Sequence, residues 1–309
     1  MTRLRPYGPG RAVGLAVVLL LGLLLGACSS APPARLPPVA ADPVPVVKKP
    51  LRLGLALGGG AARGFAHVGV IQVLEEAGIK PDLVVGTSVG SLVGAIYASG
   101  KTAAQLQQVA ETMDEAAITD WTLPLFSRGM LRGEALARYV STQVGGKTIE
   151  AMALPLGIVA TDLQSGKAVL FQRGDAATAV RASSAVPAVF LPVSINGREY
   201  VDGGLVAPVP VHFARDMGAD IVLAVDISSP PESNLASDTL QILLQTFAIM
   251  ASSINRYELQ GADVVVRPAL PNVRSADFAA KRSAIEAGRA AMLAALPQLR
   301  AALLRDKAR

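Results

Sequence analysis

A serine between two glycines is the first residue of this sequence whose setting points to chemistry. Ser88 lies in the segment Gly86–Gly90, after an apolar run at 82–85 that predicts a strand and before a helical pattern at 91–98. A serine at such a junction is held exposed on a strained turn, and the helix N-terminus beside it favours developing negative charge. The pattern predicts that Ser88 is a nucleophile. It also fits a serine that caps the helix, a common role at this position.

A second segment, Gly58–Gly64, supplies backbone amides. It follows a predicted strand at 51–57 and precedes a helical pattern at 65–77. Arg63 stands where a dinucleotide-binding fingerprint has its third glycine, and the Lys-Ser/Thr pair of a P-loop is missing. A glycine loop between strand and helix directs N–H groups at an anion, here the oxyanion of a tetrahedral intermediate. The alternative is a tight strand-to-helix turn, although such a turn needs fewer than three consecutive glycines.

Three residues are candidates for the base that activates Ser88. A Ser-His-Asp triad needs a histidine, and the chain has two, His67 and His212. His67 lies just after the glycine loop, where packing or bracing of the loop is the expected role. His212 follows Ser88, as in α/β-hydrolases, but a predicted strand and two long helices come after it. Asp202 serves as a base only if its pKa is raised or its base strength develops in the transition state; otherwise it belongs to an ordinary Asp-Gly turn.

Taken together, these segments resemble the patatin-like phospholipase family. The ordered set is Gly58–Gly64, Gly86–Gly90 and Asp202–Gly204, and the intervening Ala182–Pro192 is similar to a segment typical of bacterial members. The resemblance is close over about residues 51–210 and looser beyond them.

The resemblance implies roles for individual residues. It implies a Ser-Asp dyad without histidine, in which Ser88 is the nucleophile and Asp202 the general base. His67 and His212 would then not be essential. Backbone amides of the glycine loop would form an oxyanion hole that Arg63 shapes, and the residues assigned to this hole are Gly58, Gly59, Gly60 and Arg63.

The remaining elements alternate between strand and helix. Further strands are expected at 156–161, 168–171, 221–226 and 264–266, and further helices at 102–113, 176–184, 239–259 and 284–304, the last broken near Pro297. This alternation predicts an α/β fold. The family resemblance implies a three-layer α/β/α sandwich with a mainly parallel central sheet, formed by a single hydrolase domain at 51–309.

The first 50 residues have the composition of a targeting signal followed by a tether. Three arginines and an apolar run at 12–25 are typical of a secretory signal over 1–27, and the run is short for a membrane span. Cys28, the only cysteine, follows small residues and resembles a bacterial lipobox, which implies lipidation of Cys28. An ordinary signal peptide is the alternative. Residues 28–50, rich in Pro and Ala, predict a semi-extended tether. Ser29 favours anchoring to the outer membrane, facing the periplasm.

Composition excludes several other classes. Without the arginines of the predicted signal, the chain has 26 basic and 24 acidic residues, a net charge of +2. This balance and an aromatic content of 4% argue against nucleic-acid binding. One cysteine and two histidines argue against a disulfide framework and against a cysteine- or histidine-based metal site. We expect no metal and no cofactor.

The expected function is that of a serine hydrolase acting on acyl esters of phospholipids or other lipids, held at a membrane by a lipid anchor. A lipid-tethered binding or scaffolding protein with little turnover is one alternative, and an acyltransferase that uses the same acyl-serine is another. The apolar stripe of the helix at 239–259 either faces the core or touches lipid. The oligomeric state stays open.

Overall fold

A central eight-stranded sheet organises the part of the chain that the computed structural model describes, residues 51–122, 128–230, 237–271, 273–274 and 277–305. Its strands are β1 (Leu53–Leu57), β2 (Leu83–Thr87), β4 (Leu156–Asp162), β5 (Ala168–Phe171), β7 (Val193–Ile195), β8 (Arg198–Asp202), β9 (Ile221–Val225) and β10 (Val264–Val266). Two short strands, β3 (Gly129–Leu131) and β6 (Ala188–Phe190), form a separate pair.

The order in the large sheet is β10-β9-β1-β2-β4-β8-β7, with β5 also paired to β4. The five strands from β10 to β4 run parallel to one another. β5 and β8 are antiparallel to β4, and β7 is antiparallel to β8. The sheet is therefore mainly parallel, as the sequence predicted.

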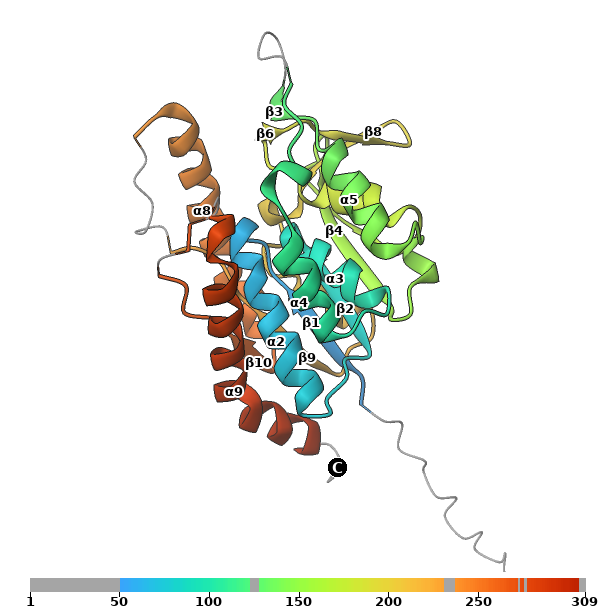
Figure 1. Ribbon diagram of the computed structural model, residues 1–309, viewed down its shortest axis with the longest axis vertical. Helices are drawn as coiled ribbons and strands as arrows, with labels where there is room; N and C mark the ends of the chain where they lie inside the picture. The colour runs from blue at the N-terminus through green and yellow to red at the C-terminus, as the bar shows by residue number, and fades with distance from the viewer. Residues whose placement is uncertain (1–50, 123–127, 231–236, 272, 275–276, 306–309) are drawn as a thin grey trace, which may run out of the picture. The chain divides into compact units, whose positions relative to one another are not determined.

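Helices cover both faces of this sheet because its strands are apolar on both sides. In β1, Leu55 and Leu57 point into one buried cluster and Ala56 into another on the opposite face. The larger cluster lies under helices that Figure 1 shows in front of the sheet, and α7 covers the smaller one. The helices that cover the two faces are α2 (Phe65–Glu76), α3 (Val89–Ala98), α4 (Ala103–Thr112), α5 (Glu134–Val144), α6 (Ala176–Ser183), α7 (Val211–Asp216) and α9 (Lys281–Arg305).

The C-terminal helix α9 corrects one expectation. The sequence predicted a break near Pro297, yet α9 continues through this residue. Proline removes one hydrogen bond and bends a helix without necessarily ending it, and Figure 1 shows the last turns of α9 running in a new direction. The helix is held against α2 at Gly69 and Gly288, where an added Cβ would lie 2.0 Å from a carbonyl oxygen of the other helix.

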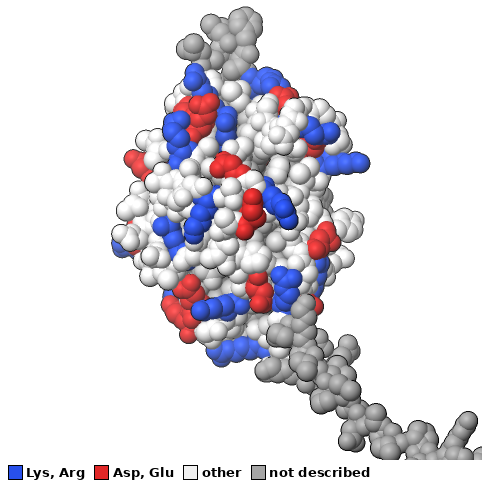
Figure 2. Space-filling model, turned by 90° about the vertical axis from the view of Figure 1, so that its right-hand side faces the viewer, with Lys and Arg blue, Asp and Glu red and all other residues white. Residues whose placement is uncertain are grey.

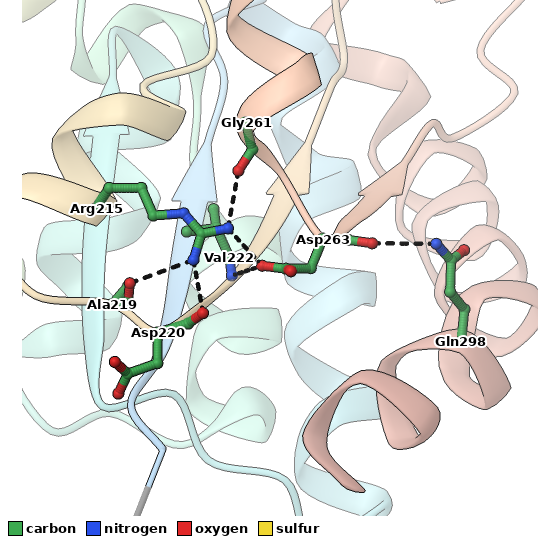
Figure 3. A network of polar contacts seen from close by, with 7 residues as sticks. All are labelled: Arg215, Ala219, Asp220, Val222, Gly261, Asp263 and Gln298. Carbon is green, nitrogen blue, oxygen red and sulfur yellow. Dashed lines mark hydrogen bonds and ion pairs between the residues drawn. The ribbon is translucent and has the colours of Figure 1, made fainter. Parts of the chain in front are cut away.

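An arginine on the opposite face ties α7 to the sheet (Figure 3). Arg215 donates to the carbonyl oxygens of Ala219, Asp220 and Gly261 and pairs with Asp263 at 2.6 Å. Asp263 also accepts the amide of Val222 in β9. One guanidinium thus fixes the end of α7 against the starts of β9 and β10.

The helix α8 (Thr239–Glu258) differs from the others because it is scarcely buried. Asn255 is its only buried residue. Along its apolar stripe, Leu243 and Met250 are exposed, at 37% and 48%, while Leu240, Phe247 and Ile254 are half-buried. None of these side chains belongs to a buried core cluster. No helix in the described part of the chain combines the length and apolar character needed to cross a membrane.

Charge is distributed evenly on the face shown in Figure 2. Lysine and arginine side chains alternate there with aspartate and glutamate. This face therefore presents no continuous basic stripe of the kind that tracks a nucleic-acid backbone.

Candidate active site

Ser88 occupies a strained turn between β2 and α3. Its backbone angles are φ 54° and ψ −127°, a region that residues other than glycine rarely adopt. The flanking glycines allow the bend, because a Cβ on Gly86 would lie 2.3 Å from the oxygen of Gly90, and a Cβ on Gly90 would lie 2.1 Å from the oxygen of Leu57. Strain of this kind costs about 1–3 kcal/mol and persists only where the surrounding structure imposes it.

The strand register brings Asp202 to this turn. Thr87, the last residue of β2, pairs with Val159 of β4, and Asp202, the last residue of β8, pairs with Ala160 of the same strand. β5 pairs with both of these β4 residues, so it occupies one edge of β4 while β2 and β8 share the other. Since β2 and β8 run in opposite directions, their C-terminal ends meet there.

The carboxyl group of Asp202 is buried, with the residue 6% exposed. Burial raises its pKa to about 6, and the amide of Gly204 and the hydroxyl of Ser88 lower it to a lesser extent. Oδ1 accepts the Gly204 amide at 2.6 Å. Oδ2 has no partner at ordinary hydrogen-bond geometry among the described residues, although the Ser88 hydroxyl is close enough to act on this pKa. Such contacts often tighten only when substrate binds.

Ser183 holds the turn at Ser88 in place through its hydroxyl group. Its hydroxyl accepts the amide of Ser88 at 2.8 Å and donates to the carbonyl of Val159 at 2.6 Å. The residue is fully buried at the end of α6. The sequence marked the segment Ala182–Pro192 only through the family resemblance, and no local pattern distinguished this serine from its neighbours.

The glycine loop lies against the serine turn, and its amides are not equivalent. A Cβ on Gly59 would lie 3.2 Å from Cβ of Ser88, so the loop passes directly beside Ser88. Gly58 and Gly59 donate their amides to the carbonyls of Val225 and Pro208, both at 3.0 Å. The assignment of Gly58 and Gly59 as oxyanion donors is therefore corrected, because their amides already have acceptors. Within the described residues, the amide of Gly60 makes no backbone hydrogen bond.

The side chain of Arg63 is directed away from the oxyanion position. Its guanidinium donates to four backbone carbonyls, those of Ile227, Ser228, Leu270 and Val273, at 2.7–3.3 Å. Arg63 is 5% exposed. Arg63 thereby anchors the glycine loop to the segments that follow β9 and β10.

Neither histidine contacts Ser88. His67 is fully buried, its Nε2 donates to the carbonyl of Gly58 at 2.9 Å, and burial lowers its pKa to about 4. It is therefore neutral and braces the glycine loop. His212 is exposed on α7, and its Nδ1 lies 2.6 Å from Oε1 of Glu258, an ion pair that raises its pKa.

An apolar cavity of about 240 Å³ adjoins Ser88. Its walls come from the glycine loop, α2, α3, α4, α5 and the segment that follows α6. Most lining side chains are aliphatic or aromatic, among them Phe65, Leu92 and Ile96. Ser88 thus stands at an apolar space suited to hydrocarbon.

Two expectations concern other parts of the chain. Cys28 and the predicted signal and tether lie outside the described residues, so lipidation stays a prediction. The described residues hold no cluster of three histidine, cysteine, aspartate or glutamate side chains placed to bind a metal.

Comparison with known proteins yields consistent matches. A family model for patatin-like phospholipase matches residues 55–215. An uncharacterised NTE family protein of Mycobacterium tuberculosis is 39% identical over 178 residues, 57% of this chain and 49% of that protein. Patatin-like phospholipase domain-containing protein 6 of Homo sapiens is 36% identical over 193 residues, 60% of this chain and 14% of that protein.

A solved structure shares the fold. VipD from Legionella pneumophila matches with a TM-score of 0.54 over 80% of this chain and 67% of that chain, at 14% identity. The aligned part spans about half the length of the mycobacterial relative. The family model covers just over half of the chain, and both Ser88 and Asp202 lie within it. The chain therefore belongs to the patatin-like phospholipase family.

Proposed function

We propose that this protein is a serine hydrolase of lipid acyl esters, with Ser88 as nucleophile and Asp202 as general base. The observation that carries the proposal is the meeting of the Ser88 turn and the buried Asp202 carboxyl at one point of the β4 edge. A pKa of about 6 keeps Asp202 mostly ionised at neutral pH while making it a stronger base than an exposed aspartate.

The reaction follows from these positions. Ser88 Oγ attacks the ester carbonyl carbon as Asp202 Oδ2 accepts the hydroxyl proton. The resulting oxyanion is stabilised by the amide of Gly60 and by the amide of Val89, the first residue of α3, which has no acceptor within the helix. The C–O bond of the ester breaks, and the departing alcohol takes the proton from Asp202. Water then attacks the acyl-serine as Asp202 takes one of its protons. The bond between Ser88 Oγ and the acyl carbon breaks, Oγ takes the proton back from Asp202, and the fatty acid is released.

Two features support a lipid substrate at a membrane surface. The cavity beside Ser88 is apolar, and the helix α8 carries no charged residue from Thr239 to Asn255 although it is largely exposed. α8 packs against the turn Gly203–Leu205 that directly follows Asp202. An uncharged exposed helix beside the site fits contact with a lipid surface, where a tether ending at a lipidated Cys28 would hold it.

The test is covalent labelling of the full chain with a fluorophosphonate, which reacts with activated serines, together with hydrolysis of a lipid ester. We expect wild type to be labelled and active, Ser88→Ala to lose both properties, and Asp202→Asn to lose at least about 10²-fold in rate. Ser99→Ala is the matched serine control, because Ser99 does not line the cavity and its hydroxyl donates only to the backbone carbonyl of Ile96 at the end of α3. A folded wild-type chain that is neither labelled nor active would favour a lipid-binding protein instead.

A further inference from the structure

The cavity at Ser88 extends along one face of α3. Its α3 lining residues are Val89, Leu92, Val93 and Ile96. Positions three and four apart lie on one face of a helix, so the wall runs without interruption from the nucleophile to Ile96. Because α3 begins directly after Ser88 and rises about 1.5 Å per residue, Ile96 lies about 12 Å from Ser88 along the helix axis.

Ile96 and Leu106 close the far end of this space. α4 begins at Ala103, a short turn after α3 ends at Ala98, and packs against α3, so its first turn lies beside the last turn of α3. Leu106 stands in that first turn and lines the cavity, as does Ile96. Leu106 is 2% exposed and Ile96 is 3% exposed, so both side chains are buried at this end of the space.

The size and lining of the cavity indicate a single hydrocarbon chain as its occupant. Its volume of about 240 Å³ is below the roughly 300–1,000 Å³ of pockets that enclose whole drug-sized ligands. A lipid with its head group and two chains does not fit. The charged lining residue Glu115 is exposed, whereas the lining residues Val93, Ile96 and Leu106 are buried. The head group would therefore stay outside.

We propose that this space binds the acyl chain of the substrate and that Ile96 and Leu106 limit its length to about eight to ten carbons. An extended chain with C–C bonds of about 1.5 Å at near-tetrahedral angles advances about 1.25 Å per carbon, so about 12 Å corresponds to this length. The inference rests on the proposed hydrolase function, since it assigns the acyl specificity of the same site.

The first measurement is kcat/KM of the full chain for p-nitrophenyl esters from acetate through butyrate, hexanoate, octanoate, decanoate and dodecanoate to palmitate. Each methylene that enters the apolar channel should raise kcat/KM by about three- to fourfold. We expect the rise to stop at octanoate to decanoate, and palmitate to react more slowly than decanoate. A rise that continues unchanged to palmitate would overturn the length limit.

Substitutions at the closed end test the two limiting residues. Ile96→Ala and Leu106→Ala should move the optimum to dodecanoate or beyond, and Ile96→Phe should move it to hexanoate or below. Ile96→Val, a smaller change, should raise the dodecanoate-to-octanoate ratio in case the alanine variant folds poorly. Ile71→Ala is the matched control, because Ile71 is a fully buried isoleucine in the same core that does not line the cavity; its profile should equal that of wild type.

Fluorophosphonate titration of Ser88 normalises each rate to the folded, active fraction. Variants that are fully labelled but keep the wild-type chain-length profile would refute the inference while leaving the hydrolase function intact. Absence of Ser88-dependent turnover with every ester would refute the hydrolase function instead. In that event, calorimetric binding of decanoate to Ser88→Ala, abolished by an added Ile96→Phe, would still support the acyl channel, and binding that is equal in both variants would exclude it.

Discussion

Ser88 and Asp202 are brought together end to end, because the strands that carry them approach the same point on one edge of β4 from opposite directions. The pairings of Thr87 with Val159 and of Asp202 with Ala160 leave no residue of β4 between them. The carbonyl of Asp202 is further held by the Thr161 hydroxyl at 2.8 Å. The geometry of the pair is thus set by the sheet backbone, which is more rigid than a loop.

The pH dependence of activity should report the carboxyl group of Asp202. Since burial raises its pKa to about 6 and the base acts in its ionised form, kcat/KM should fall about tenfold for each pH unit below about 6. Above about 7 the rate should be independent of pH until another group titrates. Rates with a short-chain ester across this range give the profile, and an acid limb centred near 4 would contradict a buried base.

An acid limb near pH 6 is usually attributed to histidine, and two variants separate these interpretations. His212 is paired with Glu258 at the surface, and His67 only donates to the Gly58 carbonyl. The double variant His67→Gln, His212→Asn should therefore keep activity within about threefold of wild type and the same limb, because the glutamine amide can still donate to Gly58. Disappearance of the limb in this variant would show that a histidine is the base.

Ionisation of the buried Asp202 carboxyl should lower the free energy of unfolding of the protein. The pKa of Asp202 is raised on folding, so the favourable contribution of its neutral form is complete below about pH 4 and is lost as pH rises through about 6. Asp202→Asn does not ionise, and at pH 8 it should be more stable than wild type by about 3 kcal/mol, with little difference near pH 4. Denaturant unfolding at both pH values measures this, and equal stability at pH 8 would argue against a desolvated charge.

Removal of the Ser183 hydroxyl should lower both activity and stability. Ser183→Ala leaves the amide of Ser88 and the carbonyl of Val159 without their partner inside the protein. An unsatisfied buried group costs about 1–3 kcal/mol, and the freed turn should lose the alignment of Ser88. We expect lower kcat at nearly unchanged KM, with Ser99→Ala as the control. Full activity in a destabilised Ser183→Ala chain would show that Ser183 contributes to stability and not to the alignment of Ser88.

The local motifs and most of the elements could be predicted from the sequence. The turn at Ser88, the glycine loop and the alternation of strands with helices depend on spacings within about 30 residues. Each can therefore be recognised in a short stretch of the sequence. The helix bounds predicted for 65–77, 102–113 and 239–259 agree closely with α2, α4 and α8. The strands β3, β6, β7 and β8 and the helices α5 and α7 were not predicted. All of them except the eleven-residue α5 have three to six residues, which carry little periodicity.

The sequence by itself determined which functional groups stand at each position: a serine on a turn between two glycines, the backbone amides of a glycine loop, and a carboxylate before two glycines. Only the tertiary structure decided which of these groups lie together and how their surroundings change their properties. The register on β4 places Asp202 beside the Ser88 turn, backbone acceptors occupy the amides of Gly58 and Gly59, and burial raises the pKa of the Asp202 carboxyl. These properties depend on neighbours far away in the chain, and a local pattern does not contain the desolvation or the acceptors that such neighbours supply.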